Sequence, residues 1–307
     1  MSQRPFNLIG ELINHSFARA RRAWEAKDTS AYQHLAKIQE TGGAGALTVN
    51  IDGTQSLRVK QEEMIAFLPD LVPALQEATS LPLAFDNPAI AYHAKALELY
   101  DFSKSARPIF NSISASRENL DEMFALIKQY DTDVIVMASE KLADGQSLPC
   151  ENAQDVYEST LYFTQRLREE AGRTNDQIIV DPGLAPVASD TYGLINMGLD
   201  GMRMIRQDPI LTGVHLSIGL TNFSFGVPKN IREGLENAYI TLAMEAGLDT
   251  VLGNPEKDLH MLPEDSPYLT VVRDALELGR PKEGETQEDA GFMQSEKIMD
   301  LFDLNND

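Results

Sequence analysis

The chain has little cysteine and few basic residues, and each shortage excludes a class of protein. Among 307 residues Cys150 is a single cysteine, which excludes an internal disulfide and a zinc site built mainly from thiolates. Lysine and arginine together number 26 against 47 aspartates and glutamates, which gives a net charge of −21. This surplus of negative charge repels a phosphate backbone. The densest basic cluster, at residues 19–22, is followed at once by acidic residues. We therefore expect no nucleic-acid partner.

Long apolar segments are also missing. The amino-terminal stretch MSQRPFNLIGELIN is too short, and too soon interrupted by Glu11, to resemble a signal peptide. No later run approaches the roughly 20 apolar residues of a membrane span. We expect a soluble, cytoplasmic protein with no membrane partner. Its 43% content of apolar residues is enough to build a large core.

Several motifs of catalysis and cofactor binding are absent too. The five histidines show neither HxxxH nor HExxH spacing, so we expect no metal bound by this chain. The sequence contains no GxSxG elbow, no GxGxxG after a strand and no GxxxxGK[ST] loop. The sequence therefore gives no motif that would indicate a serine hydrolase, a dinucleotide-binding protein or a P-loop enzyme.

What the sequence does contain is an alternation of short apolar runs with longer amphipathic segments, from Pro5 to about Gly279. This order is typical of a parallel sheet with crossover helices. Eight βα units predict an α/β protein with a TIM (β/α)8 barrel at residues 1–279, and the alternative is an open α/β sheet. The first helical segment spans Phe17–Thr41. The predicted strands are Phe6–Ile9, Ala46–Val49, Leu83–Phe85, Pro108–Phe110, Asp133–Met137, Gln177–Val180, Val214–Gly219 and Thr250–Leu252.

After Gly279 the composition becomes polar and acidic, and a short amphipathic helix is expected around Ser295–Phe302. Residues 280–307 are therefore interpreted as an acidic C-terminal tail, or as a segment that docks on the barrel or on a second subunit. Docking would cover apolar side chains that a tail would expose. These are Phe292, Met293, Met299 and Phe302.

Short polar residues follow the predicted strands, at the end where catalytic groups of such barrels lie. Any one of them is more often a helix cap or a turn residue. Together they predict a mouth that is rich in hydrogen-bonding groups and lacks cationic phosphate clamps. Carboxylates and carboxamides there suit a flat heteroaromatic ring with an amide-like edge, such as a pterin. The set comprises Asn50, Asn111, Asn222, Asn254, Asp86 and Asp181.

With these motifs in order, the chain resembles the pterin-binding methyltransferases that move a methyl group between methyltetrahydrofolate and a corrinoid protein. This family includes the folate domain of cobalamin-dependent methionine synthase. The resemblance covers roughly residues 7–255. Its motifs are IGELIN, LTVNIDG, LAFDN, IFNSIS, VDPGLAPV, GLTNFSFGVP and AGLDTVLGNP.

The resemblance implies roles for individual residues. Asn222 would lie beside N5 of the folate, the nitrogen that carries the methyl group, as the catalytic residue. Lys229 and Arg232 could contact the folate tail, although a solvated helical turn explains them equally well. The residues implied in pterin binding are Asp86, Asn111, Asp181, Asn50, Asn222 and Glu11. Related chains often carry aspartate where Thr48 stands and serine where Asn87 stands, which puts one polar contact in doubt.

The resemblance also implies substrates and partners. Tetrahydrofolate or 5-methyltetrahydrofolate would be the substrate, and cobalamin would be carried by a separate corrinoid protein, because this chain has no DxHxxG motif. A homodimer is expected from the family pattern. The resemblance leaves the direction of transfer open and favours a component of glycine betaine or methoxyaromatic demethylation. Two alternatives are a dihydropteroate synthase-like enzyme, although LAPVASD after VDPG lacks the expected lysine, and a non-catalytic folate- or corrinoid-binding subunit.

Overall fold

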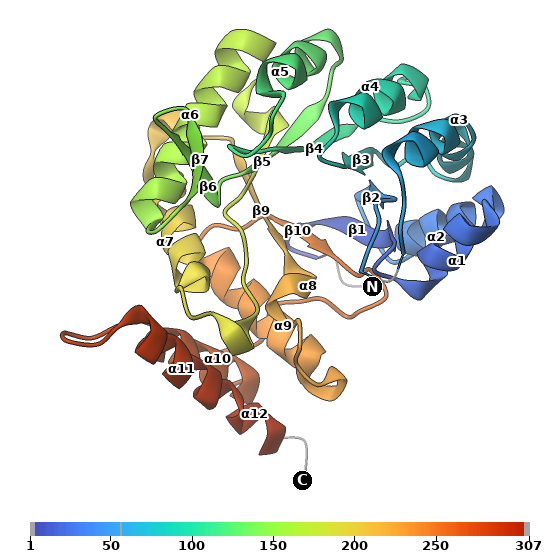
Figure 1. The fold of residues 1–307 in the computed structure, drawn as a ribbon. Helices are drawn as coiled ribbons and strands as arrows, with labels where there is room; N and C mark the ends of the chain where they lie inside the picture. The colour runs from blue at the N-terminus through green and yellow to red at the C-terminus, as the bar shows by residue number, and fades with distance from the viewer. Residues whose placement is uncertain (1–3, 56, 304–307) are drawn as a thin grey trace.

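Eight parallel strands close into a barrel in the computed structural model, which describes residues 4–55 and 57–303 (Figure 1). Neighbours around the barrel follow chain order, and β1 pairs with β10 to close it. The predicted TIM barrel is thus confirmed. The strands are β1 Asn7–Asn14, β2 Ala46–Asn50, β3 Leu83–Asp86, β4 Ile109–Ile113, β5 Asp133–Met137, β8 Ile178–Asp181, β9 His215–Gly219 and β10 Thr250–Gly253.

Helices surround the barrel and bury their apolar faces against the outside of the strands (Figure 1). Their spacing in the chain follows the crossover pattern that parallel strands require. They are α1 Ala18–Ala26, α2 Thr29–Thr41, α3 Gln61–Ala78, α4 Ile90–Leu99, α5 Leu120–Gln129, α6 Ala153–Ala171, α7 Leu194–Gln207, α8 Leu220–Phe223, α9 Lys229–Glu245, α10 Pro267–Leu278, α11 Gln287–Ile298 and α12 Asp300–Asp303. Short 3-10 turns are η1 Asn175–Gln177, η2 Val187–Ser189 and η3 Pro209–Leu211.

The inside of the barrel changes character along its axis. A small apolar cluster separate from the outer core fills its middle: Ile9, Ala46, Ala84, Ile109, Ile135 and Ile179. Because side chains two residues apart point to the same side of a strand, the next inward positions toward the carboxyl ends also face the interior. These positions are polar at Glu11, Thr48, Asp86, Asn111 and Asp181. The apolar layer is therefore the floor of a polar mouth.

The predicted single helix at Phe17–Thr41 is wrong, because the chain breaks between α1 and α2. Lys27 ends α1 in the left-handed conformation, with a φ of 49°. Asp28 then caps α2, since its side chain accepts hydrogen bonds from the amides of Ser30 and Ala31. The left-handed Lys27 ends the first helix, and the aspartate N-cap begins the second.

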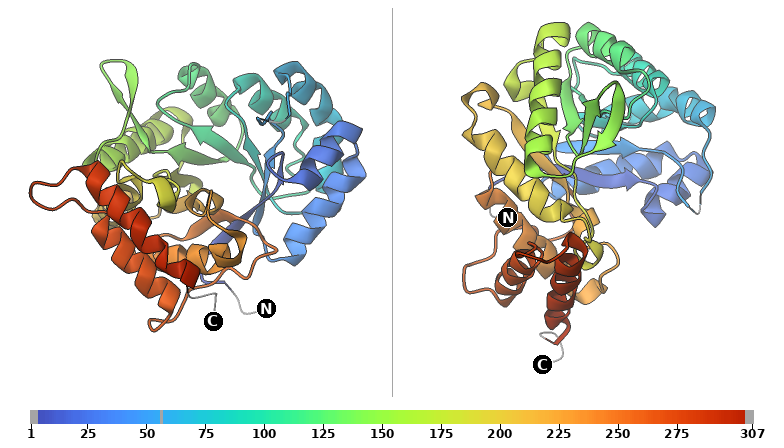
Figure 2. Two further views of the ribbon diagram at one scale, coloured as in Figure 1. Left: turned by 60° about the horizontal axis from the view of Figure 1, so that its bottom comes forward. Right: turned by 60° about the vertical axis from the view of Figure 1, so that its left-hand side comes forward.

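A β-hairpin that the sequence analysis did not predict follows β5. Strands β6, Glu140–Ala143, and β7, Gln146–Pro149, pair antiparallel and stand out from the barrel (Figure 2). Asp144 and Gly145 connect them, both with positive φ. An Asp-Gly pair between two strands is a strong hairpin signal, so this element could have been recognised from the sequence.

The segment after Gly279 packs on the barrel. Helix α11 lies along α10 and against η2, near the loop that follows β8 (Figure 2). Gln294 Nε2 donates to the carbonyl of Val187 at 3.3 Å, and the side chains of Ile298 and Leu301 are buried. The helix begins earlier than the predicted Ser295–Phe302 and continues into α12. Of the four apolar side chains that docking was expected to cover, Phe302 is half-buried, whereas Phe292, Met293 and Met299 stay exposed because α11 turns other residues toward the barrel.

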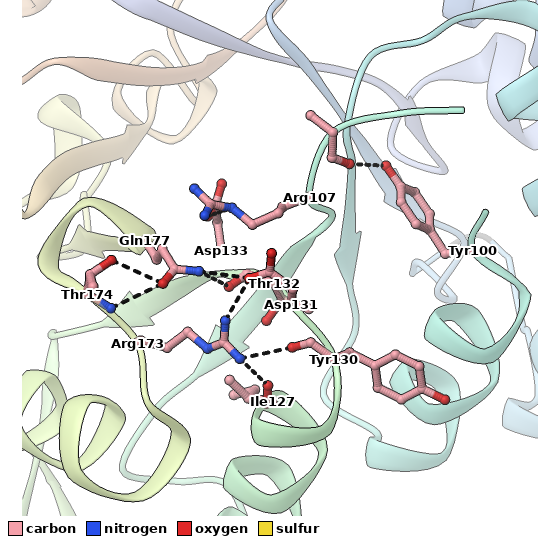
Figure 3. A network of polar contacts seen from close by, with 11 residues as sticks. Tyr100, Arg107, Ile127, Tyr130, Asp131, Thr132, Asp133, Arg173, Thr174 and Gln177 are labelled. Atoms are coloured by element: carbon pink, nitrogen blue, oxygen red, sulfur yellow. Dashed lines mark hydrogen bonds and ion pairs between the residues drawn. The ribbon is translucent and has the colours of Figure 1, made fainter. Parts of the chain in front are cut away.

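A polar network lies at the amino ends of β5 and β8, opposite the mouth (Figure 3). Arg173 donates to Asp131 Oδ1 at 3.0 Å and to the carbonyls of Ile127 and Tyr130. Gln177 Nε2 donates to the same aspartate at 3.1 Å. Groups at this end of such a barrel stabilise the fold. In the described part of the chain, none of the helices is both long and apolar enough to cross a bilayer.

Candidate active site

A β-bulge in β1 lies directly beside Glu11. The pairing of β1 with β2 shifts by one residue between Gly10 and Ile13. The irregularity leaves the amide of Leu12 outside the strand ladder, and Gln39 Oε1 of α2 accepts a hydrogen bond from it at 2.8 Å. Bulges are frequent beside active sites, where they redirect a side chain. The Glu11 side chain lies at this irregularity, on the inner face that it shares with Ile9.

A second bulge lies in β4, where the pairing with β5 shifts between Asn111 and Ile113. The extra residue, Ser112, accepts two hydrogen bonds from Arg117: one from Nε to its carbonyl and one from Nη2 to its hydroxyl, each 3.1 Å long. Burial raises the pKa of Asp86 and of Asp52, and the nearby charge of Arg117 opposes that rise at both carboxyls. This cation could not be recognised from the sequence, because nothing local shows that its side chain turns back toward the mouth.

Three of the predicted residues come together at the ends of β2, β3 and β4. Asn50 Nδ2 donates to Asp86 Oδ2 at 3.0 Å, while Asp86 and Asn111 are direct partners in the strand register. Burial raises the pKa of the Asp86 carboxyl, and the hydrogen bond from Asn50 opposes that rise. This half of the mouth offers a carboxylate flanked by two carboxamides.

Asp181 ends β8, four positions away from β2 in the strand order. Its Oδ1 atom accepts a hydrogen bond from the amide of Gly183 at 2.8 Å. Burial raises the pKa of this carboxyl to about 6, and the Gly183 amide lowers it. The group therefore changes charge near neutral pH.

The third group of side chains connects β1 with the short helix α8. Thr221 Oγ1 donates to Glu11 Oε1 at 2.6 Å. Burial raises the pKa of Glu11 to about 7, against the hydrogen bond from Thr221 and the charge of Lys257. The next residue, Asn222, is exposed, and its Nδ2 would lie 3.1 Å from a Cβ added at Gly219. The amide thus folds back over the end of β9. In the sequence Thr221 is only one letter of the GLTNFSFGVP motif, and its bond to Glu11 could not be predicted because it depends on the fold.

A buried ion pair supports this side of the mouth. Lys257 Nζ donates to both carboxylate oxygens of Glu236, at 2.7 and 2.6 Å, and Ser224 Oγ donates to the same carboxylate at 2.5 Å. Glu236 is only 1% exposed, so its charge requires these partners. Ser224 follows α8, and the pair therefore holds the chain just beyond Asn222.

The remaining predicted residues lie toward the rim. Asn254 Oδ1 accepts from the amide of Glu256 at 2.9 Å, as in an ordinary turn. Lys229 is exposed at the start of α9, while Arg232 Nε donates to the carbonyl of Val227 at 2.6 Å. Among the residues that the structure describes, no group of three or more histidine, cysteine, aspartate or glutamate side chains could hold a metal ion.

Polar side chains gathered at the carboxyl ends of the strands of a (β/α)8 barrel are the layout of an enzyme active site. Residues 12–252 match the family described as pterin binding enzyme, and the chain belongs to this family. The family predicted from the sequence is thereby confirmed.

Two curated relatives and one solved structure extend this comparison. Methylcorrinoid:tetrahydrofolate methyltransferase of Eubacterium limosum is 26% identical over 256 residues, which are 81% of this chain and 84% of that protein. Methionine synthase of Mycobacterium leprae (strain TN) is 23% identical over 96% of this chain, which corresponds to 23% of that protein. Both names support the predicted methyltransferase class. A dihydropteroate synthase structure from Xanthomonas albilineans has a TM-score of 0.56 at 18% identity, covers 90% of this chain and 92% of its own, and shows the shared fold.

Proposed function

We propose that this chain transfers a methyl group between N5 of tetrahydrofolate and a corrinoid carried by a separate protein. The observation that carries the proposal is the arrangement of Asn50, Asp86 and Asn111 at the ends of β2, β3 and β4, with Glu11 of β1 bonded to Thr221 of α8, the helix that also carries Asn222. The relative named methylcorrinoid:tetrahydrofolate methyltransferase supports the reaction and favours transfer toward tetrahydrofolate.

In this proposal the pterin ring lies in the mouth, over the apolar floor. Ring N–H groups donate to the carboxylates of Asp86 and Asp181, and the carboxamides of Asn50 and Asn111 supply further donors and acceptors. Each of these side chains comes from a different strand, so the ring is fixed on several sides. Lys229 and Arg232 remain candidates for the acidic folate tail, with Lys229 the more available because Arg232 already bonds its own loop.

The chemical step requires control of one proton. When tetrahydrofolate accepts the methyl group, the lone pair of N5 forms the new N–C bond, the Co–C bond breaks and its electron pair stays on cobalt. The methylated N5 must then release its proton. Glu11, with its pKa raised to about 7, is ionised in part at neutral pH and can receive this proton, directly or through water.

Asn222 has a different part in this step. A carboxamide does not exchange protons at neutral pH, but it donates through Nδ2 and accepts through Oδ1. Its exposed side chain at the end of β9 can therefore hydrogen-bond N5 in both protonation states. The corrinoid supplies the cobalt atom that carries the methyl group. Asn222 and Glu11 would serve the reverse direction equally.

Purified protein incubated anaerobically with methylcobalamin and tetrahydrofolate tests the proposal. We expect 5-methyltetrahydrofolate to form, and the Asn222→Ala variant to lose most of the turnover while its dissociation constant for 5-methyltetrahydrofolate changes little. Folate binding without turnover would favour a non-catalytic subunit instead. Formation of dihydropteroate from a dihydropterin diphosphate and 4-aminobenzoate would favour the synthase alternative.

The partner and the assembly are part of the same proposal. The corrinoid protein, an upstream donor such as glycine betaine or a methoxyaromatic compound, and a homodimer remain predictions from the family resemblance. Sedimentation of the pure chain measures its mass directly, and a monomer at micromolar concentration would contradict the homodimer.

A further inference from the structure

The hydroxyl of Thr48 is buried at the bottom of the mouth without a hydrogen-bond partner. The side chain is 1% exposed, and Oγ1 has no donor or acceptor within bonding distance among the described residues. A buried hydroxyl that makes no hydrogen bond destabilises a protein. Valine has nearly the same shape and suits a strand at least as well. The fold alone therefore gives no reason for threonine at this position.

The register of the barrel shows where this hydroxyl lies. Thr48 pairs with Ala84 of β3, and Ala84 belongs to the apolar floor inside the barrel. Within β2, Ala46 is part of the same floor, and Asn50 bonds Asp86 at the mouth. Side chains alternate along a strand, so Ala46, Thr48 and Asn50 share the inner face. Thr48 thus lies between the floor and the Asn50–Asp86 pair.

From this position we infer that Thr48 Oγ1 forms a hydrogen bond with the pterin ring of the folate, which makes it a determinant of ring recognition. The inference rests on the proposed function. A polar ring that contacts Asn50 and Asp86 brings its edge directly above the Thr48 hydroxyl, which can donate or accept. Bound ligand would supply the partner that the protein lacks.

Two substitutions separate the hydroxyl from the shape of the side chain. Thr48→Val removes only the hydroxyl, whereas Thr48→Ser keeps it. Without ligand, we expect Thr48→Val to melt at the same temperature as the wild type or higher, because no bond is lost. Its dissociation constant for 5-methyltetrahydrofolate, measured by calorimetry, should rise about tenfold, and that of Thr48→Ser by less than about threefold. In turnover, KM should rise while kcat changes little, since the hydrogen bond is made equally in the bound substrate and in the transition state.

A smaller ligand locates the contact. The head-group analogue 6-methylpterin should lose affinity for Thr48→Val by the same factor as the folate. Equal affinity of Thr48→Val and wild type for both ligands would overturn the inference and leave the proposed function intact. A loss confined to the folate would also overturn it, because the hydroxyl would then act on the tail. Failure of the wild type to bind either ligand would reject the proposed function and this inference together. If Thr48→Val does not fold, Thr48→Ala replaces it.

Discussion

At the scale of single residues, the site contains carboxyl groups whose ordinary ionisation is opposed by burial. The pKa values of Glu11 and Asp181 are raised to about 7 and 6, and each group keeps one hydrogen-bond donor that favours the charged form. A raised pKa means that the folded protein binds the proton more tightly than the unfolded chain does. Such groups are frequent at catalytic sites and reduce stability there.

Glu11→Gln should therefore stabilise the protein at alkaline pH. The pKa of Glu11 rises from 4.5 to about 7 on folding, so the folded protein binds this proton more tightly than the unfolded chain does. The bound proton therefore stabilises the fold fully below pH 4.5, and this stabilisation is lost as the pH rises through 7. Glutamine carries no charge and can still accept from Thr221. Denaturation at pH 5 and pH 8 should show a larger gain for the variant at pH 8, of up to about 3 kcal/mol. An equal gain at both values would contradict the raised pKa.

The residues could be predicted in part from the sequence. Asn50, Asp86, Asn111 and Asp181 are recognisable because each directly ends or follows an apolar run. Arg117 and the bond from Thr221 to Glu11 could not be predicted, because they depend on how loops from different strands turn toward each other. The roles of all these residues in binding and catalysis stay predictions.

At the scale of elements, two of the strands that carry the polar side chains of the mouth, β1 and β4, contain β-bulges. The β1 bulge is stabilised from outside the barrel by Gln39, which is fully buried. Gly10 allows this approach, since a Cβ added there would lie within clashing distance of the Gln39 side chain. Hydrophobic alternation predicts strands and helices, but a bulge arises from tertiary contacts. Eight strands were therefore predictable, while the two shifts of register were not.

Gly10→Ala should destabilise the protein by about 1–3 kcal/mol, because the methyl group displaces Gln39 and leaves the Leu12 amide without its acceptor. Chemical denaturation measures the effect. Gly45→Ala is the matched control, since a Cβ there meets only the Leu8 carbonyl at 3.8 Å. Combined with Gln39→Ala, the Gly10→Ala substitution should cost less than the sum of the two single changes. Full additivity would show that the two residues act independently.

At the scale of the whole molecule, α11 and α12 extend the barrel on the side of β8. They contact α10 and η2, and Gly291 packs closely against the backbone of Asp190 and Thr191. The acidic composition of this segment suggested a tail as readily as a docked element. Amphipathic spacing over so short a segment predicts a helix, but it does not show which part of the barrel the helix packs against.

Deletion of residues 281–307 should lower the melting temperature by several degrees, because it removes the buried side chains of Ile298 and Leu301 and uncovers α10. The folded fraction should bind 5-methyltetrahydrofolate as the full chain does, since the proposed ligands lie on the strands and on α8. Calorimetry below the melting temperature checks this expectation. A truncated protein that is equally stable would show that the segment contributes little to folding.

The apolar floor beneath the mouth is uneven, and this shape bears on the orientation of any bound ring. Ala46 and Ala84 lie on β2 and β3, whereas isoleucines 9, 109, 135 and 179 lie on β1, β4, β5 and β8. Small side chains leave more room beside β2 and β3, next to Thr48, than the isoleucines leave beside β4, β5 and β8. A planar ring in the mouth would therefore reach deeper on the β2–β3 side, and enlarging either alanine would remove this difference.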